Sequence, residues 1–206
     1  MKSGPEQIAL PLDWPHSSGD SRLILSAANQ PASEHFRKWT MWPVKATILT
    51  GPRRSGRTLL ARAFVERVGG RLIDGAERAD EEELFHAWNN AQDSGRPLVM
   101  IADAVPPDWA PQLPDLRTRI AVTPITQVGL PDDALFPQLI ELLFADRGLY
   151  IPGEALRFMS ERLERDYWAA ERAVEVVDRF AIADRARLSL PTVRRALAEA
   201  NLISRE

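Results

Sequence analysis

The stretch VKATILTGPRRSGRTLL, residues 44–60, decides the fold class. It opens with the β-branched run VKATIL at 44–49, which predicts a buried strand. A Gly-rich loop follows, and TLLARAFVERV at 58–68 then has apolar residues at helical spacing. Loop amides and the first turn of a helix point at one place in such a unit and favour an anion there. The stretch therefore predicts a strand–loop–helix unit of the kind that binds phosphate in other proteins.

The loop departs from the nucleotide-binding pattern G-x-x-x-x-G-K-[ST] at one position. Gly51, Gly56 and Thr58 fit, but Arg57 stands where the pattern has lysine. Arginine keeps the charge but is a planar fork, whereas lysine is a compact point charge. On these residues alone, a ligand-free turn is as good an interpretation; the flanking strand and helix favour phosphate binding. The candidate nucleotide-binding residues here are Gly51, Pro52, Ser55, Gly56, Arg57, Thr58 and Leu59.

Further strands and helices alternate along the first two thirds of the chain, which predicts an α/β fold with a parallel sheet. The runs RLID at 71–74 and PLVMIAD at 97–103 read as strands that end in Asp74 and Asp103. Either carboxylate could assist nucleotide chemistry or be a solvated loop residue. The predicted elements are strands at 21–26, 44–49, 71–74, 97–103 and 122–129, and helices at 29–39, 58–68 and 80–95, the last with Asp80 as N-cap.

From about Leu130 the pattern becomes purely helical, with segments at 132–148, 153–166, 168–186 and 191–202. Because Pro137 falls inside the first segment, we expect that helix to start later than Asp133. The sequence predicts a tail over 1–20, an α/β core over 21–129 and a small all-helical domain over 130–206.

Composition limits the possible functions. The 206 residues carry a net charge of −3 and 45% hydrophobic residues, so the chain is globular and has no basic field that would favour nucleic acid. It has no cysteine, and its three histidines are scattered, so we expect no metal site. No signal peptide and no apolar run of about 18 residues is recognisable, so we expect no membrane contact and a cytoplasmic location.

The order of these motifs resembles the AAA+ module of the bacterial replication initiator DnaA: a phosphate loop, two strand-end aspartates, LPDLRTR at 113–119 and a helical lid. With QIALPL at 7–12 and DEEELFHAW at 80–88, the chain resembles the Hda-type regulatory inactivators of DnaA over roughly residues 7–202. The resemblance implies an AAA+ P-loop core plus a lid. It assigns Asp74 to the Walker B position, Asp103 to sensor I, and Arg119 to an arginine that faces the nucleotide of a partner DnaA. It also implies ADP rather than ATP as the ligand, or no nucleotide.

By the same resemblance, QIALPL is a motif that binds the DNA polymerase sliding clamp. In an extended segment, the Gln7 amide would enter a polar notch while Leu10 and Leu12 enter an apolar pocket, and Pro11 would lower the ordering cost. The alternative is a tail that packs its leucines on its own domain.

The sequence also departs from the family pattern. The stretch before DEEELFHAW is short, as if a strand–helix unit were missing, so RLID has two interpretations: the Walker B strand or the strand before it. Gly75 stands where a second acid is usual. Trp168 lies where a sensor II arginine is expected, with Arg165 and Arg172 out of register; we expect it to pack the lid onto the core. These defects predict weak or absent ATP turnover by the chain itself.

These observations favour a non-enzymatic regulator that binds the clamp and DnaA and supplies Arg119 as an arginine finger in trans, limiting replication initiation. As a rival interpretation, Arg117 and Arg119 are plain surface residues. Two other functions stay open: a P-loop ATPase or kinase with its own substrate, and a DnaA-like interaction module without nucleotide. Direct nucleic-acid binding is the weakest alternative, and homo-oligomer formation stays open.

Overall fold

The structure is a computed structural model that describes residues 24–203. The predicted tail, including the QIALPL motif at 7–12, lies outside the described residues. The strand expected at 21–26 is wrong where it can be examined, because Ile24 to Ser26 belong to no strand. Among the described residues, no helix has the length and apolar character needed to cross a lipid bilayer.

Within the described range, four parallel strands form the sheet, in the order β2-β3-β1-β4. The strands are β1 (Ala46–Thr50), β2 (Arg71–Asp74), β3 (Leu98–Ile101) and β4 (Ile125–Gln127). Asp74 and Leu49 both lie level with Ile101, so the carboxyl ends of these strands share one edge of the sheet. This confirms the predicted α/β fold with a parallel sheet. β2 is an edge strand, separated from β1 by β3.

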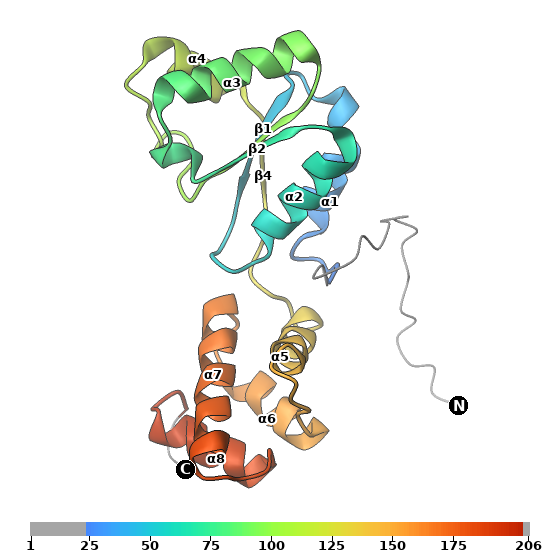
Figure 1. The fold of residues 1–206 in the computed structure, drawn as a ribbon, viewed down its shortest axis with the longest axis vertical. Helices are drawn as coiled ribbons and strands as arrows, with labels where there is room; N and C mark the ends of the chain where they lie inside the picture. The colour runs from blue at the N-terminus through green and yellow to red at the C-terminus, as the bar shows by residue number, and fades with distance from the viewer. Residues whose placement is uncertain (1–23, 204–206) are drawn as a thin grey trace, which may run out of the picture.

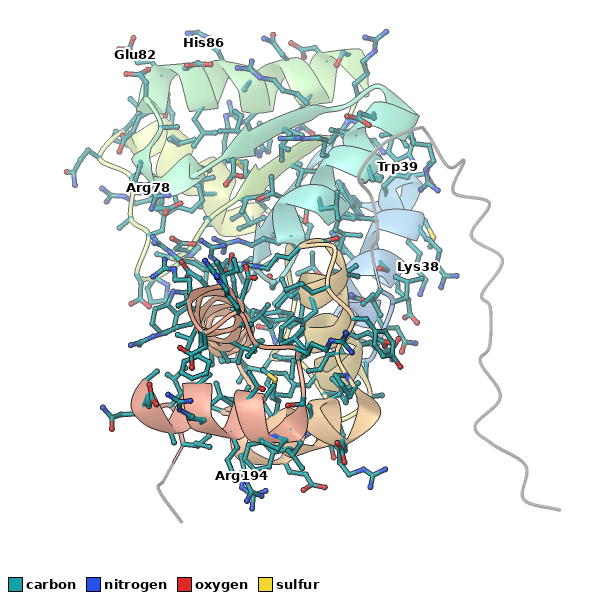
Figure 2. The ribbon with its side chains drawn as sticks, turned by 60° about the horizontal axis from the view of Figure 1, so that its bottom comes forward. Lys38, Trp39, Arg78, Glu82, His86 and Arg194 are labelled. Atoms are coloured by element: carbon teal, nitrogen blue, oxygen red, sulfur yellow. The ribbon has the colours of Figure 1, made fainter. Side chains whose placement is uncertain are left out.

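Helices cover both faces of the sheet (Figure 1). Successive side chains of a strand point to opposite faces: Ile48 packs with α3 (Glu81–Ser94) and α4 (Pro114–Val122), whereas Leu49 packs with α1 (Gln30–Arg37) and α2 (Arg57–Val68). Glu82 and His86 point outward from α3 (Figure 2). The central strands are thus buried on both sides, which explains their continuous apolar runs.

Two carboxylates at the start of α3 satisfy backbone donors, one at the start of α3 itself and one at the start of α4. Asp80 caps α3 as predicted, its carboxylate accepting from the Glu83 N–H at 2.8 Å. The Glu81 carboxylate accepts from the backbone N–H groups of Gln112 and Leu113, at 2.8 and 2.6 Å. Because Leu113 precedes the first residue of α4, Glu81 satisfies donors at that helix start.

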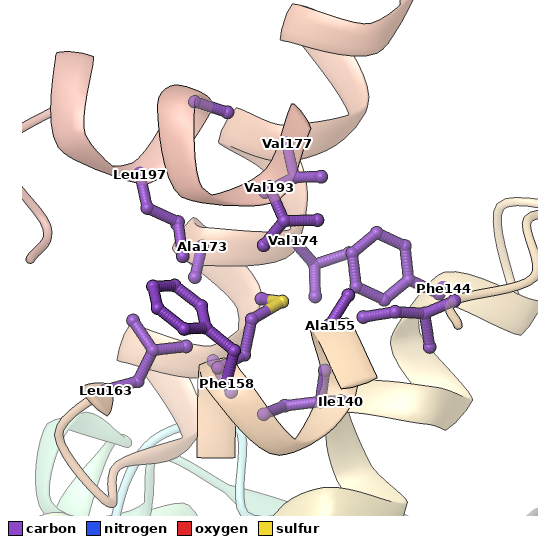
Figure 3. Packing of buried hydrophobic residues seen from close by; sticks show 14 of the residues in the cluster. Ile140, Phe144, Ala155, Phe158, Leu163, Ala173, Val174, Val177, Val193 and Leu197 are labelled. Atoms are coloured by element: carbon purple, nitrogen blue, oxygen red, sulfur yellow. The ribbon is translucent and has the colours of Figure 1, made fainter. Parts of the chain in front are cut away.

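The lid consists of four helices in the described chain: α5 (Leu135–Ala145), α6 (Gly153–Arg162), α7 (Tyr167–Ala183) and α8 (Leu190–Glu199). α5 begins after Asp133, as predicted, and Pro137 falls in its first turn, where no intrahelical N–H donor is needed. The helices enclose their own core (Figure 3), built from residues such as Phe144, Phe158 and Val174. The lid therefore has a hydrophobic core separate from the two beside the sheet.

Tyr167 joins the lid to the α/β layer, its hydroxyl donating to the Gly129 carbonyl at 3.2 Å. Burial, together with the charges of Asp132 and Asp166, raises the pKa of Tyr167 from 10.0 to about 12. The unfolded chain thus loses this proton at lower pH than the folded chain. This contribution to stability is complete below pH 10 and lost as the pH rises through about 12.

We therefore expect Tyr167→Phe to remove that part of the pH dependence. Urea unfolding of both proteins just below pH 10 and near pH 12 gives the loss of unfolding free energy with pH for each. The difference between the two losses is the contribution of the Tyr167 phenol, because all other titrating groups are the same in both proteins. An unchanged alkaline loss of stability in the phenylalanine variant would contradict the assignment.

Candidate functional site

The phosphate loop joins β1 to α2 at the carboxyl edge of the sheet. Gly51 has φ +146°, and a Cβ there would lie 2.5 Å from the Val128 carbonyl oxygen, so a side chain does not fit. Gly56 is the N-cap of α2 in a left-handed conformation and gives no side-chain cap. The Ser55 hydroxyl is buried and has no hydrogen-bond partner among the described residues. An uncapped helix start beside an orphaned hydroxyl fits the phosphates of a nucleotide.

Arg57 reaches back across this loop. Its Nη1 donates to the Gly51 carbonyl at 2.8 Å, and its Nη2 pairs with the Asp103 carboxylate. The side chain is 11% exposed, so it lies inside the loop rather than in solvent. Its partner Asp103 comes two residues after β3. Arg57 therefore links the loop to the end of the central strand.

The Asp103 carboxylate has two further arginine neighbours. Arg53 Nη2 lies 3.2 Å and Arg78 Nη1 3.5 Å from its Oδ2. The hydrogen bond from Arg57 lowers the pKa of Asp103; partial burial opposes this, and Arg53 adds to the lowering. Asp103 is therefore an ionised acceptor held by three guanidinium groups.

Thr58 and Asp74 lie together at the other side of the loop. The Thr58 hydroxyl donates to Asp74 Oδ2 at 2.9 Å. In P-loop nucleotide hydrolases, the loop Ser/Thr and a strand-end Asp hold Mg²⁺. The pair fits that ion, and this geometry favours the Walker B interpretation of Asp74 over the alternative.

The position after Asp74, where a second acid is usual, is Gly75, and the guanidinium group of Arg78 lies beside it. Gly75 has φ +70°, and Arg78 Nη2 lies 2.9 Å from the point where a Cβ of Gly75 would stand. Arg78 extends from the 3-10 turn η2 (Ala76–Arg78) and is labelled in Figure 2. A guanidinium group has no acceptor and cannot orient an attacking water as a carboxylate does. This part of the site suits phosphate binding better than hydrolysis.

The lid meets the loop through α7. Glu171 pairs with Arg54 at the loop tip, where Arg54 has φ +64°. Trp168, one turn earlier, is 53% exposed, and the Arg172 guanidinium lies 5.2 Å from its ring centre. The expectation that Trp168 packs the lid onto the core is therefore wrong; the lid is held to the loop by an ion pair.

Arg119 lies far from its own phosphate loop. It is near the end of α4, which leads into the start of β4, so it sits at the amino end of a sheet whose loop is at the carboxyl end. Its guanidinium lies over Trp88 and Phe85 of α3, 4.7 and 5.0 Å from the ring centres. Its Nε is buried without a partner among residues 24–203. Arg117 instead donates to the Pro111 carbonyl, at 2.9 and 2.7 Å.

The structure thus groups most of the predicted site. The loop residues from Gly51 to Leu59 lie with Asp74 and Asp103 at one edge, Arg119 lies apart, and Gln7, Leu10, Pro11 and Leu12 are outside the described residues. Sequence reasoning missed Arg53, Arg54, Arg78 and Glu171. The doubled arginine of GPRRSG was the available signal; nothing local indicates the others.

Comparison with known proteins supports a relation to DnaA. No family model matches the sequence. An uncharacterised protein of Haemophilus influenzae is 30% identical over 121 residues, 57% of this chain and 52% of that protein. DnaA of Thermus thermophilus is 26% identical over 128 residues, 62% of this chain and 29% of DnaA. The matches thus span about half or less of these relatives.

Solved structures settle the fold. Domain III of Thermotoga maritima DnaA superposes with a TM-score of 0.70 at 15% identity, over 89% of this chain and 95% of that one. The chain shares the fold of DnaA domain III. The Thermotoga maritima RuvB branch-migration motor also superposes, with a TM-score of 0.60 at 16% identity, over 82% of this chain and 67% of RuvB. Because both share the fold, function has to be argued from the sites.

Proposed function

We propose that this DnaA-related protein regulates replication initiation by completing the ATP site of DnaA. In this proposal, QIALPL binds the DNA-loaded sliding clamp, the α/β layer docks on ATP-bound DnaA, and Arg119 promotes hydrolysis of the ATP that DnaA holds. The superposition over 95% of DnaA domain III carries the proposal, because a chain of that shape can take the place of a DnaA neighbour.

The position of Arg119 supports action in trans. β1 is five residues long, about 16 Å, and separates the amino end of the sheet from the chain's own loop. Arg119 must leave the Phe85 and Trp88 rings to reach a partner's phosphate. The cation–π contacts it gives up are worth about 0.5–2 kcal/mol. An arginine finger in trans raises the rate by about 10³–10⁵, the equivalent of about 4–7 kcal/mol, so the exchange is favourable.

The chain's own loop serves in this proposal to hold ADP rather than to turn over ATP. The orphaned Ser55 hydroxyl and the uncapped start of α2 provide phosphate contacts. Gly75 and Arg78 replace the acid that would orient water. Bound ADP would then fix the conformation that DnaA recognises.

A reconstituted assay tests the function. ATP hydrolysis is measured for DnaA alone, for DnaA with this chain, and for both with sliding clamp loaded on DNA. We expect acceleration only in the complete mixture. Equal rates in all three mixtures would overturn the proposal.

The Thr58–Asp74 pair favours a second candidate, an ATPase acting on its own substrate, because these are the residues that hold Mg²⁺ in such enzymes. ATP turnover by the purified chain with Mg²⁺ separates the two. The regulatory proposal expects turnover at background, unchanged by Thr58→Ala; the rival expects turnover that this substitution removes.

A further inference from the structure

Three arginines from two segments gather around one carboxylate at the mouth of the phosphate loop. Arg53 and Arg57 belong to the loop and α2, and Arg78 to η2, yet all approach Asp103. The Arg57 side chain is 11% exposed, whereas those of Arg53 and Arg78 are 77% and 62% exposed. Two of the three guanidinium groups can therefore be reached by a ligand.

The charges in this cluster are shared unevenly. Arg53, Arg57 and Arg78 all face Asp103, Glu77 pairs with Arg78 at 2.6 Å, and Asp74 is held by Thr58 rather than by an arginine. A site built on the usual pattern has one lysine, a strand-end Asp and a second acid, and depends on Mg²⁺ to balance the nucleotide phosphates. Here the Thr58–Asp74 pair of that pattern is present, but the second acid is absent and two arginines are added.

Guanidinium groups can take over part of the role of the metal. Arginine matches phosphate oxygens with two parallel hydrogen bonds, and these charge-assisted bonds are about twice as strong as neutral ones. Arg78 fills the space beside Gly75, next to Asp74, and Arg53 lies on the loop itself. Both contact Asp103, the carboxylate that also pairs with Arg57, the first residue of α2.

We propose that Arg53, Arg57 and Arg78 bind the phosphates of a nucleoside diphosphate at this loop without Mg²⁺, and that Asp103 competes with the ligand for these arginines. The inference rests on the proposed function, in which the loop holds ADP. When no diphosphate is present, the guanidinium groups stay on Asp103; when it enters, they turn from the carboxylate to the phosphates.

The competition gives Asp103 an effect opposite to that of an ordinary binding residue. Removing its charge releases Arg53 and Arg57 from their carboxylate partner, leaves Arg78 with Glu77 alone, and removes repulsion between the carboxylate and the phosphates. Asp103→Asn should therefore tighten ADP binding, by about fivefold for one charge interaction near the surface. A site in which Asp103 contributes to binding predicts the reverse.

Isothermal titration calorimetry of the full chain with ADP, in excess EDTA and in Mg²⁺, tests the proposal. We expect binding in EDTA within about twofold of that in Mg²⁺, about tenfold weaker binding for Arg78→Ala, and tighter binding for Asp103→Asn. Arg96→Ala is the matched control, because Arg96 is exposed just before β3, at the opposite end of the sheet.

Three results would each overturn the proposal: binding only in the presence of Mg²⁺, weaker binding by Asp103→Asn, or no heat from ADP with either the wild type or Asp103→Asn. In the last case the cluster is a self-neutralising structural link. The DnaA hydrolysis assay separates this failure from failure of the proposed function. If the wild-type chain stimulates DnaA in that assay, the regulatory role stands even though ADP does not bind in the absence of Mg²⁺.

Discussion

Arg119→Ala is expected to abolish the stimulation of DnaA-bound ATP hydrolysis. Under conditions in which the wild type is fully active, the hydrolysis rate should fall by about 10³-fold or more. Alanine removes the cation that would stabilise charge developing on the transferred phosphate. Clamp binding should be unchanged, because the proposed clamp contacts are at residues 7–12. Single-turnover hydrolysis with DnaA measures the first effect, and titration with clamp measures the second.

Two variants control for indirect effects of that substitution. Arg117→Ala changes an exposed arginine on the same helix that donates to the Pro111 carbonyl, and it should keep stimulation. Arg119→Lys keeps a cation but loses the planar fork, and should recover only part of the rate. Because Arg119 covers Phe85 and Trp88, thermal unfolding of each variant should be compared. Stimulation retained by folded Arg119→Ala would refute the role of this residue.

The double substitution Gln7→Ala with Leu10→Ala is expected to weaken clamp binding by about 10²-fold or more. An interface anchor that enters a pocket costs about 2 kcal/mol when truncated, and two anchors are removed here. Surface plasmon resonance on immobilised clamp gives the Kd values. Ser17→Ala with Ser18→Ala is the matched control, since it alters the same predicted tail outside the motif. Equal affinities of the double variant and the wild type would show that Gln7 and Leu10 do not bind the clamp.

Local patterns predicted the local structure well. The strand, loop and helix around Gly51, the Asp80 cap and the later start of the Pro137 helix all follow from interactions within a few residues. The parallel sheet followed from the alternation of strands and helices. The strand expected at 21–26 is wrong for residues 24–26, which the structure describes. A short apolar run does not indicate whether a partner strand is available to pair with it.

The side-chain network of the site could not be predicted in the same way. Arg78 meets Asp103 across 25 positions, and Arg54 meets Glu171 across 117 positions. Neither pair has a sequence period or spacing that would indicate it. Trp168 was likewise expected to be packed but is exposed. Its exposure depends on how the lid lies against the loop, which the local sequence does not indicate. The phosphate loop was visible in the sequence, but the arginines that surround it became visible only in the fold.

The most direct test of the central claim follows the fate of ATP already bound to DnaA. DnaA is preloaded with radiolabelled ATP, unlabelled ATP is added in excess, and the label on DnaA is followed after addition of this chain and DNA-loaded clamp. The account predicts rapid conversion of the preloaded label to ADP on DnaA. Persistence of labelled ATP on DnaA, while the chain hydrolyses the free pool, would contradict it and identify the chain as an ATPase in its own right.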